Sequence, residues 1–136
     1  MFYVNVKQML KEIIKEDKLL ERLIDNGNIT KKQLDYIIVR KKLTGKMKDI
    51  LIQTDKGKIS KSAYSITKDR GVNNIKKSFY TLILAYYLDI IAKDSFIALE
   101  KVTNIINNVK GRTLTKEQVN DVVKTLESIF DQLISI

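Results

Sequence analysis

No proline interrupts this chain of 136 residues, and glycine occurs only five times. Proline and glycine are the residues that most often break helices, so their scarcity favours long helices. The chain also lacks Cys and His, which removes disulfides, thiolate and imidazole metal ligands, and histidine general bases. Its length suits one compact domain. The sequence therefore predicts an all-α fold, a single-domain bundle of about six to seven helices.

Apolar residues recur every three or four positions near both ends of the chain, as they do on an amphipathic helix. We expect outer helices over residues 4–25 and 115–135, the first of them stopped by Asn26 and Gly27. The apolar stripe over 119–134 can be used in two ways. It can complete the core, or it can form a homodimer interface through the terminal helices.

Three helix starts carry capping signals. Thr30 with Gln33 and Thr115 with Gln118 have the spacing of a capping box. In this motif the side chain of each residue accepts a hydrogen bond from the backbone N–H group of the other. Ser60 precedes a third helical stretch and is a good N-cap residue.

The most apolar stretch lies in the middle of the chain, over residues 72–91, and its apolar residues cover most of the helix circumference. A helix that is apolar nearly all round is normally buried on several sides, so this one is expected at the centre of the domain. Its longest apolar run, 79–92, contains Asp89 and is shorter than the roughly 20 residues that span a bilayer. The N-terminal residues lack the pattern of a signal peptide, so we expect a soluble, cytoplasmic protein without a membrane partner.

The net charge of +9 is concentrated in one segment. Residues 40–77 contain twelve Lys and Arg but only three Asp, whereas acidic and basic residues balance in the rest of the chain. Like charges gathered in one segment repel each other unless a polyanion relieves them. Nucleic acid is the commonest such partner for a small domain, so double-stranded DNA is the expected ligand.

Residues 45–80 have the pattern of a helix-turn-helix: a short helix over 46–53, a loop containing Gly57, and a second helix capped by Ser60. Ile59, Ala63, Ile66 and Thr67 would then face inward, Lys61, Ser62, Ser65, Lys68 and Asp69 would face outward, and Tyr64 would lie at the margin. The stretch LTGKMKDILIQTDKGKISKSAYSITKDRGVNNIKKS resembles the helix-turn-helix in region four of bacterial sigma factors. In that family a Ser-led recognition helix continues into a basic stretch with an Arg and an Asn, here Arg70 and Asn74, and the resemblance implies DNA binding.

Gly71 indicates a second frame, because glycine within a helix costs about 1 kcal/mol relative to alanine. In this frame the first helix ends near Arg70, residues 69–74 form the turn, and the helix from Asn73 reads DNA. This frame resembles winged-helix regulators, in which a Gly-hydrophobic pair opens the second helix. A third interpretation makes residues 50–60 a β-hairpin around the Asp-Lys-Gly turn, and it ranks last because the flanking residues do not alternate cleanly.

Catalysis has little support in the sequence. No glycine-rich phosphate-binding loop is present. Asp49, Asp55 and Asp69 are isolated among lysines, whereas a metal-dependent nuclease needs clustered carboxylates. We therefore predict no catalytic residue, no metal site and no cofactor.

The sequence thus predicts a DNA-binding protein that regulates transcription or serves a plasmid or other mobile element. Its phosphate contacts would come from Arg40, Lys41, Lys42, Lys56, Lys58, Lys76 and Lys77. Its base contacts would come from Lys61, Ser62, Ser65 and Lys68, or in the second frame from Asn73, Asn74 and Lys77. The alternative is a non-catalytic helical interaction protein with a basic face for an acidic partner, which would show an exposed apolar groove.

Overall fold

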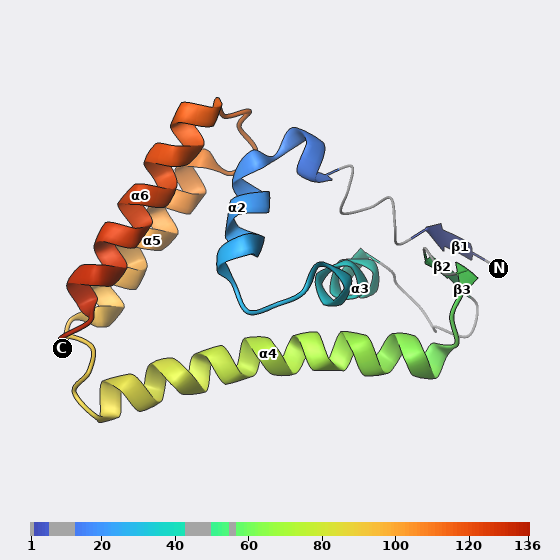
Figure 1. Ribbon diagram of the computed structural model, residues 1–136, viewed down its shortest axis with the longest axis horizontal. Helices are drawn as coiled ribbons and strands as arrows, with labels where there is room; N and C mark the ends of the chain where they lie inside the picture. The colour runs from blue at the N-terminus through green and yellow to red at the C-terminus, as the bar shows by residue number, and fades with distance from the viewer. Residues whose placement is uncertain (1, 6–12, 43–49, 55–56) are drawn as a thin grey trace.

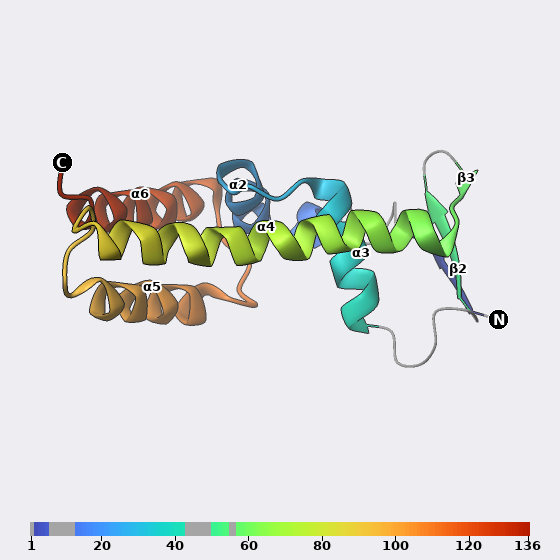
Figure 2. The ribbon, with the colours of Figure 1, turned by 90° about the horizontal axis from the view of Figure 1, so that it is seen from below.

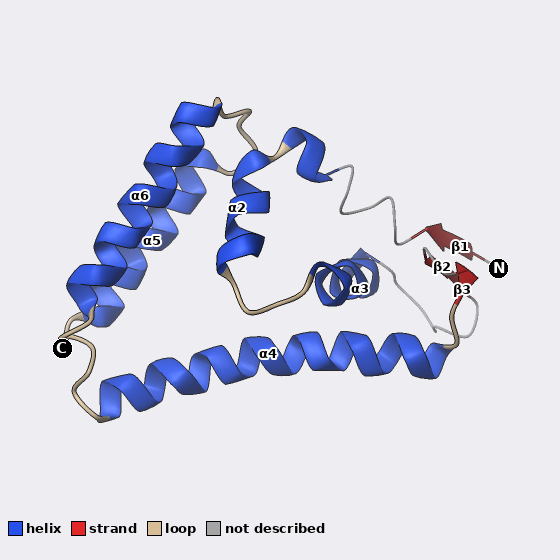
Figure 3. Ribbon diagram, viewed as in Figure 1, coloured by secondary structure: helices blue, strands red, loops and turns tan. Residues whose placement is uncertain are grey.

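The computed structural model describes residues 2–5, 13–42, 50–54 and 57–136, with side chains described for 13–41 and 59–136. After a helical turn at 13–16, the helices are α2 (Lys18–Asn26), α3 (Lys31–Lys42), α4 (Lys61–Tyr87), α5 (Ser95–Val109) and α6 (Lys116–Leu133). The strands are β1 (Phe2–Asn5), β2 (Ile50–Thr54) and β3 (Gly57–Lys58). The predicted, mostly helical single-domain class is confirmed, with a small sheet in addition (Figure 3).

The sheet corrects two predictions. β2 pairs in parallel with β1 and antiparallel with β3, in the order β1-β2-β3. The helix predicted over 46–53 is therefore wrong at 50–53, and the hairpin interpretation is right for that stretch. The single helix predicted over 4–25 is also wrong, because residues 4 and 5 belong to β1 and the helix is interrupted at Asp17, whose side chain caps α2.

The predicted helix starts are confirmed. Each capping box is closed by two hydrogen bonds, of 3.1 and 3.1 Å between Thr30 and Gln33 and of 2.9 and 3.2 Å between Thr115 and Gln118. The Ser60 hydroxyl accepts a hydrogen bond from the Ala63 backbone N–H at 3.1 Å. These caps satisfy donors that would otherwise be unpaired in the first helical turn.

The described helices have the outline of a triangle, with α2 and α3 lying between its sides (Figure 1). α4 forms one side, and the antiparallel pair α5 and α6 forms a second side that meets the end of α4 near the C-terminus. The meeting point is held by a β-bridge between Ile91 and Ile134 and by the Ala92 N–H donating to the Leu133 carbonyl at 2.9 Å. Seen from below, α3 crosses behind the first half of α4, and α5 and α6 lie to either side of its second half (Figure 2).

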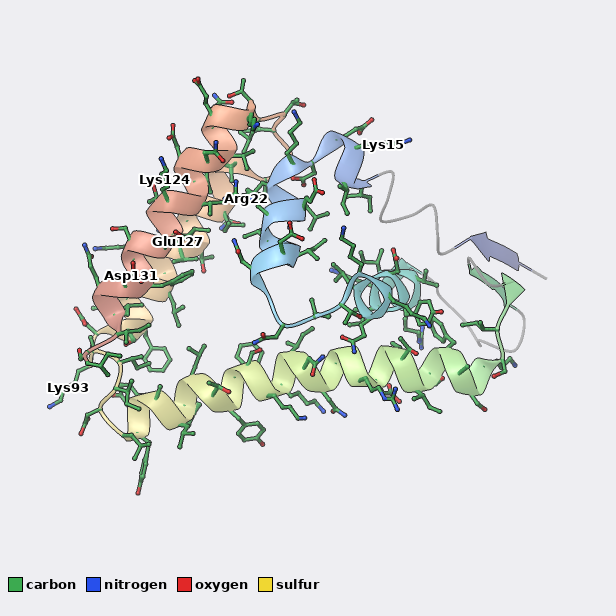
Figure 4. All side chains as sticks on the ribbon, in the orientation of Figure 1. Lys15, Arg22, Lys93, Lys124, Glu127 and Asp131 are labelled. Atoms are coloured by element: carbon green, nitrogen blue, oxygen red, sulfur yellow. The ribbon has the colours of Figure 1, made fainter. Side chains whose placement is uncertain are left out.

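Two small cores hold the triangle together. The first joins α2 to α6 through Leu19, Val119 and Val123, with the Arg22 guanidinium donating to the Asn120 carboxamide oxygen at 2.7 Å beside them (Figure 4). The stripe predicted over 119–134 is therefore used for packing within the chain, at least at its first turns. Farther along the stripe Phe130 and Ile134 are exposed, so the homodimer through the terminal helices stays a prediction.

The second core joins α3 to α4 and is built on two tyrosines. Tyr36 and Tyr64 are buried, with their ring centroids 5.1 Å apart, and the Tyr64 hydroxyl donates to the Tyr36 carbonyl at 2.6 Å. Val39 completes the contact with no exposed surface. The structure thus places Tyr64 in the core, not at the margin of a DNA-reading face.

Gly71 lies inside α4 and is buried against α3. A Cβ atom at this position would come within 2.8 Å of the Ile37 Cδ1 atom and 3.0 Å of the Gln33 Cβ atom. Glycine is therefore favoured here by the close approach of the two helices, which offsets its weak helix propensity. Because α4 continues unbroken through 69–74, the turn of the second frame is wrong, and neither predicted helix-turn-helix is formed.

The second half of α4 also departs from expectation. Residues 79–90 were predicted to be buried at the centre of the domain, but Phe79, Ile83, Leu84 and Leu88 are more than half exposed. The all-round apolar pattern is real, yet the helix lies along one edge of the triangle. Its own chain covers only part of its circumference.

The tyrosine contact between α3 and α4 predicts a matched pair of variants. Tyr64→Phe removes a buried hydrogen-bond donor and should lower the free energy of unfolding by about 1 kcal/mol. Tyr80→Phe removes the same hydroxyl from a side chain that is 75 % exposed, and it should change the free energy of unfolding by less than about 0.5 kcal/mol. Urea unfolding at one protein concentration measures both, and equal losses would contradict the role given to Tyr64.

Tyr64 also predicts a dependence of stability on alkaline pH. Desolvation by burial raises the pKa of Tyr64 from 10.0 to about 12, and the nearby Arg40 charge opposes this only partly. A raised pKa means that the folded state holds the hydroxyl proton more tightly than the unfolded state does. The contribution of the protonated Tyr64 to the free energy of unfolding is therefore complete below pH 10 and is lost as the pH rises from 10 through 12. The stability difference between wild type and Tyr64→Phe should therefore fall by about 1 kcal/mol between pH 9 and 11. A constant difference would show that Tyr64 titrates normally.

Candidate nucleic-acid interface and apolar groove

One side of α4 carries exposed basic and amide side chains. Arg70, Asn73, Lys76 and Lys77, here called the basic face, are all exposed and follow the helical spacing of three and four residues. They lie on the opposite side from Gly71, which packs against α3. Within the described residues none of the three cations forms an ion pair. The basic face is thus free to contact a ligand.

The start of α4 presents fewer of the predicted side chains. Lys61 and Ser62 are exposed, as predicted, but Ser65 and Lys68 are half-buried. The Lys68 ammonium lies 3.3 Å from the Asp69 carboxylate, which is a surface pair of small energetic value.

The inward set predicted for this turn is also partly wrong. Ala63 and Ile66 are exposed, whereas Ile59 and Thr67 are half-buried. The side that packs on α3 is set by Tyr64 and Gly71, seven residues apart, and not by the residues predicted to face inward.

The remaining predicted cations come from α3 and the loops. Arg40 and Lys41 are exposed near the end of α3. Lys56 and the side chains of Lys42 and Lys58 lie outside the described residues.

Asn74 has a structural role instead of a reading role. Its side-chain amide donates to the Gln33 carboxamide oxygen at 3.0 Å, across the contact between α3 and α4. Gln33 in turn closes the capping box with Thr30. The adjacent Asn73 is exposed, whereas Asn74 is half-buried and hydrogen-bonded within the chain.

An apolar groove lies at the other end of α4, where α4, α5 and α6 converge. Its volume is about 530 Å³, and only apolar atoms contribute to its exposed lining. The lining residues are Phe79, Thr81, Leu82, Ile83, Ala85, Tyr86, Ile90, Ile91, Ser95, Phe96, Leu99, Phe130, Leu133 and Ile134. The Tyr86 and Phe96 rings meet in it with centroids 5.8 Å apart.

A second apolar surface runs along α4 outside the groove. Tyr80, Leu84 and Tyr87, here called the apolar ridge, are 75 %, 58 % and 82 % exposed, and none of them lines the groove. They are spaced by four and three residues, so they share one side of the helix. The sequence indicated an exposed apolar groove only for the alternative interaction protein and did not place it, although the all-round apolar pattern of residues 72–91 was the available signal.

Other chemistry has less support in the described part of the chain. No group of three or more metal-binding side chains is found there, and no described helix has the length and apolar character needed to cross a bilayer.

Comparison with known families, curated proteins and solved structures finds no match to the chain. The resemblances to sigma factors and winged-helix regulators therefore stay without support, and the described residues of their motifs lie in β2, β3 and the continuous helix α4.

The different roles of the two asparagines can be tested. Alanine at either position improves helix propensity by the same amount, but only Asn74→Ala removes a bond between α3 and α4. We expect Asn74→Ala to be about 1 kcal/mol less stable than Asn73→Ala in urea unfolding. If the two variants are equally stable, the carboxamide contact between Asn74 and Gln33 contributes nothing.

Proposed function

We propose that this protein is a non-catalytic DNA-binding protein that contacts double-stranded DNA through the basic face of α4. The observation that carries the proposal is the placement of charge. The segment holding the chain's whole net charge of +9 includes α4 as far as Lys77, and there Arg70, Lys76 and Lys77 are exposed on one continuous helix. Regulation of transcription or a role on a plasmid or other mobile element would both use such a surface.

The physical argument rests on phosphate neutralisation. Lys and Arg that contact DNA phosphates release condensed counterions, so binding strengthens with the number of cations that reach the backbone. A regular helix presents its cations at fixed spacing, and an α-helix fits the major groove of B-DNA. The carboxamide of Asn73 lies among these cations and can bond an adenine edge with two hydrogen bonds. Arg70, Lys76 and Lys77 then position the helix, and Asn73 is the candidate base reader.

A helical interaction protein is the second candidate, and the apolar groove is the observation that favours it. Monomeric soluble proteins rarely expose apolar patches larger than a few hundred Å². The basic face ends at Lys77 and the groove begins at Phe79, so the two functions use different residues of α4 and are compatible within one molecule. An acidic protein partner would use the same basic face as DNA.

Fluorescence anisotropy with a labelled mixed-sequence duplex, titrated at several salt concentrations, tests the proposal. Contacts to five to eight phosphates, from the three cations of the basic face together with Arg40, Lys41 and Lys61, should give a slope of log affinity against log salt of about −4 to −7. The triple variant Arg70→Glu, Lys76→Glu, Lys77→Glu should flatten this slope by about 3, because each lost phosphate contact changes it by about 1.

The matched control carries the same charge change elsewhere. Lys101, Lys110 and Lys124 are exposed on or beside α5 and α6, in the charge-balanced part of the chain (Figure 4 labels Lys124). Their triple Glu variant should keep the wild-type slope to within about 1. No binding of the wild type at about 50 mM salt, where nonspecific affinity is high, would refute DNA binding and direct attention to an acidic protein.

A further inference from the structure

The second half of α4 exposes more apolar surface than a solitary chain of this size normally shows. Phe79, Tyr80, Tyr87 and Phe96 are 63–82 % exposed. A buried aromatic side chain removes roughly 150–250 Å² from water, so these four alone expose roughly 400–700 Å². Leucine and isoleucine side chains between them add to this area. The total approaches the roughly 800 Å² per partner of a standard stable interface.

A small molecule is a poor occupant for the groove. Ligand pockets of about this volume normally contain a few polar groups that orient the ligand. Here the exposed lining of the 530 Å³ groove is entirely apolar. Nothing in the lining would select one small molecule over another, whereas packed side chains of another polypeptide need only a matching apolar shape.

The surface contains both halves of a self-complementary contact. The groove is concave, and the apolar ridge on the same helix projects Tyr80, Leu84 and Tyr87 into solvent. A two-fold symmetric dimer uses one surface patch twice, so it needs a recess and a projection on the same patch. We propose that the second half of α4, with α5, is the interface of a homodimer in which the ridge of each chain packs into the groove of the other.

The charge distribution favours a second copy over a foreign partner. Between Phe79 and Ala92 the only ionisable side chain charged at neutral pH is Asp89, so the α4 part of the interface offers little charge for an acidic or basic partner to match. The last cation of the basic face, Lys77, precedes the patch, and the other cations of α4 lie farther toward its start. α4 has 27 residues, or about 40 Å at 1.5 Å per residue. Two chains joined at its apolar end can therefore hold the cations at the start of the helix, up to Arg70, beyond the screening length of about 8–10 Å.

This interface differs from the one predicted from the sequence in being centred on α4, although the end of α6 also lines the groove. It also does not rest on DNA binding, because its contacts are apolar side chains from Phe79 onward and need no nucleic acid. Its test is therefore made on the protein alone.

Sedimentation equilibrium of the full chain at several concentrations measures the proposed dimer. Wild type should give twice the chain mass of 15.7 kDa. The variant Leu84→Glu, Tyr87→Glu places two carboxylates on the ridge and should weaken association by at least about 100-fold, since each buried unpaired charge is costly. Both residues are more than half exposed within one chain, so circular dichroism should show unchanged helix content.

Ile66→Glu provides the matched control. Ile66 is another exposed aliphatic residue of α4, at 52 %, but it lies in the first half of the helix, away from the groove. This variant should remain dimeric. A wild-type protein that stays monomeric at about 100 µM would overturn the proposal whatever the variants do. A dimer unaffected by the ridge variant, or equally weakened by Ile66→Glu, would also overturn it, by placing the interface elsewhere.

Discussion

The contact between α3 and α4 is the constraint on which the rest of the structure depends. α4 is 27 residues long, and the packing of Tyr64 on Tyr36 and of Gly71 on Ile37 fixes its first half against the N-terminal part of the chain. Asn74 extends the same contact to the capping box of α3 through Gln33. Because one side of α4 is occupied in this way, the basic face on its other side is held toward solvent. The contact therefore sets which of the clustered cations can meet a ligand.

The second half of α4 has no equivalent packing contact with another described helix. This difference between its two halves determines which apolar side chains stay exposed. α5 and α6 return toward α2 and use Val119 and Val123 to pack on Leu19, so they close the triangle without covering α4 all round. The apolar residues that a central helix would bury remain at the surface. Burial of apolar area is the main favourable contribution to both folding and association, and the same side chains can serve a second chain where they do not serve their own. The groove and the ridge follow from this arrangement.

Much of the local structure could be predicted from the sequence because it depends on neighbouring residues. The Thr30 and Thr115 capping boxes, the Ser60 cap and the stop at Gly27 each involve groups within a few positions of one another. The errors came from long-range contacts. From the sequence alone, Gly71 indicates a break in the helix. What favours glycine there is the close approach of Ile37, which lies 34 positions earlier in the chain. β2 lacked clean alternation, yet its pairing with β1 gives it a place in a sheet.

The candidate site was predictable in its charge but not in its geometry. Clustered lysines and arginines indicated a polyanion partner, yet only the structure separates exposed Asn73 from bonded Asn74. The continuity of α4 adds a further geometric consequence. With no loop between them, Lys77 and Tyr80 keep a fixed rotational phase of about 100° per residue. Inserting one residue between them would turn the ridge by that angle relative to the basic face, whereas inserting seven would nearly restore the phase and lengthen the helix by about 10 Å. α4 thereby fixes both the distance and the rotation angle between the basic face and the apolar ridge.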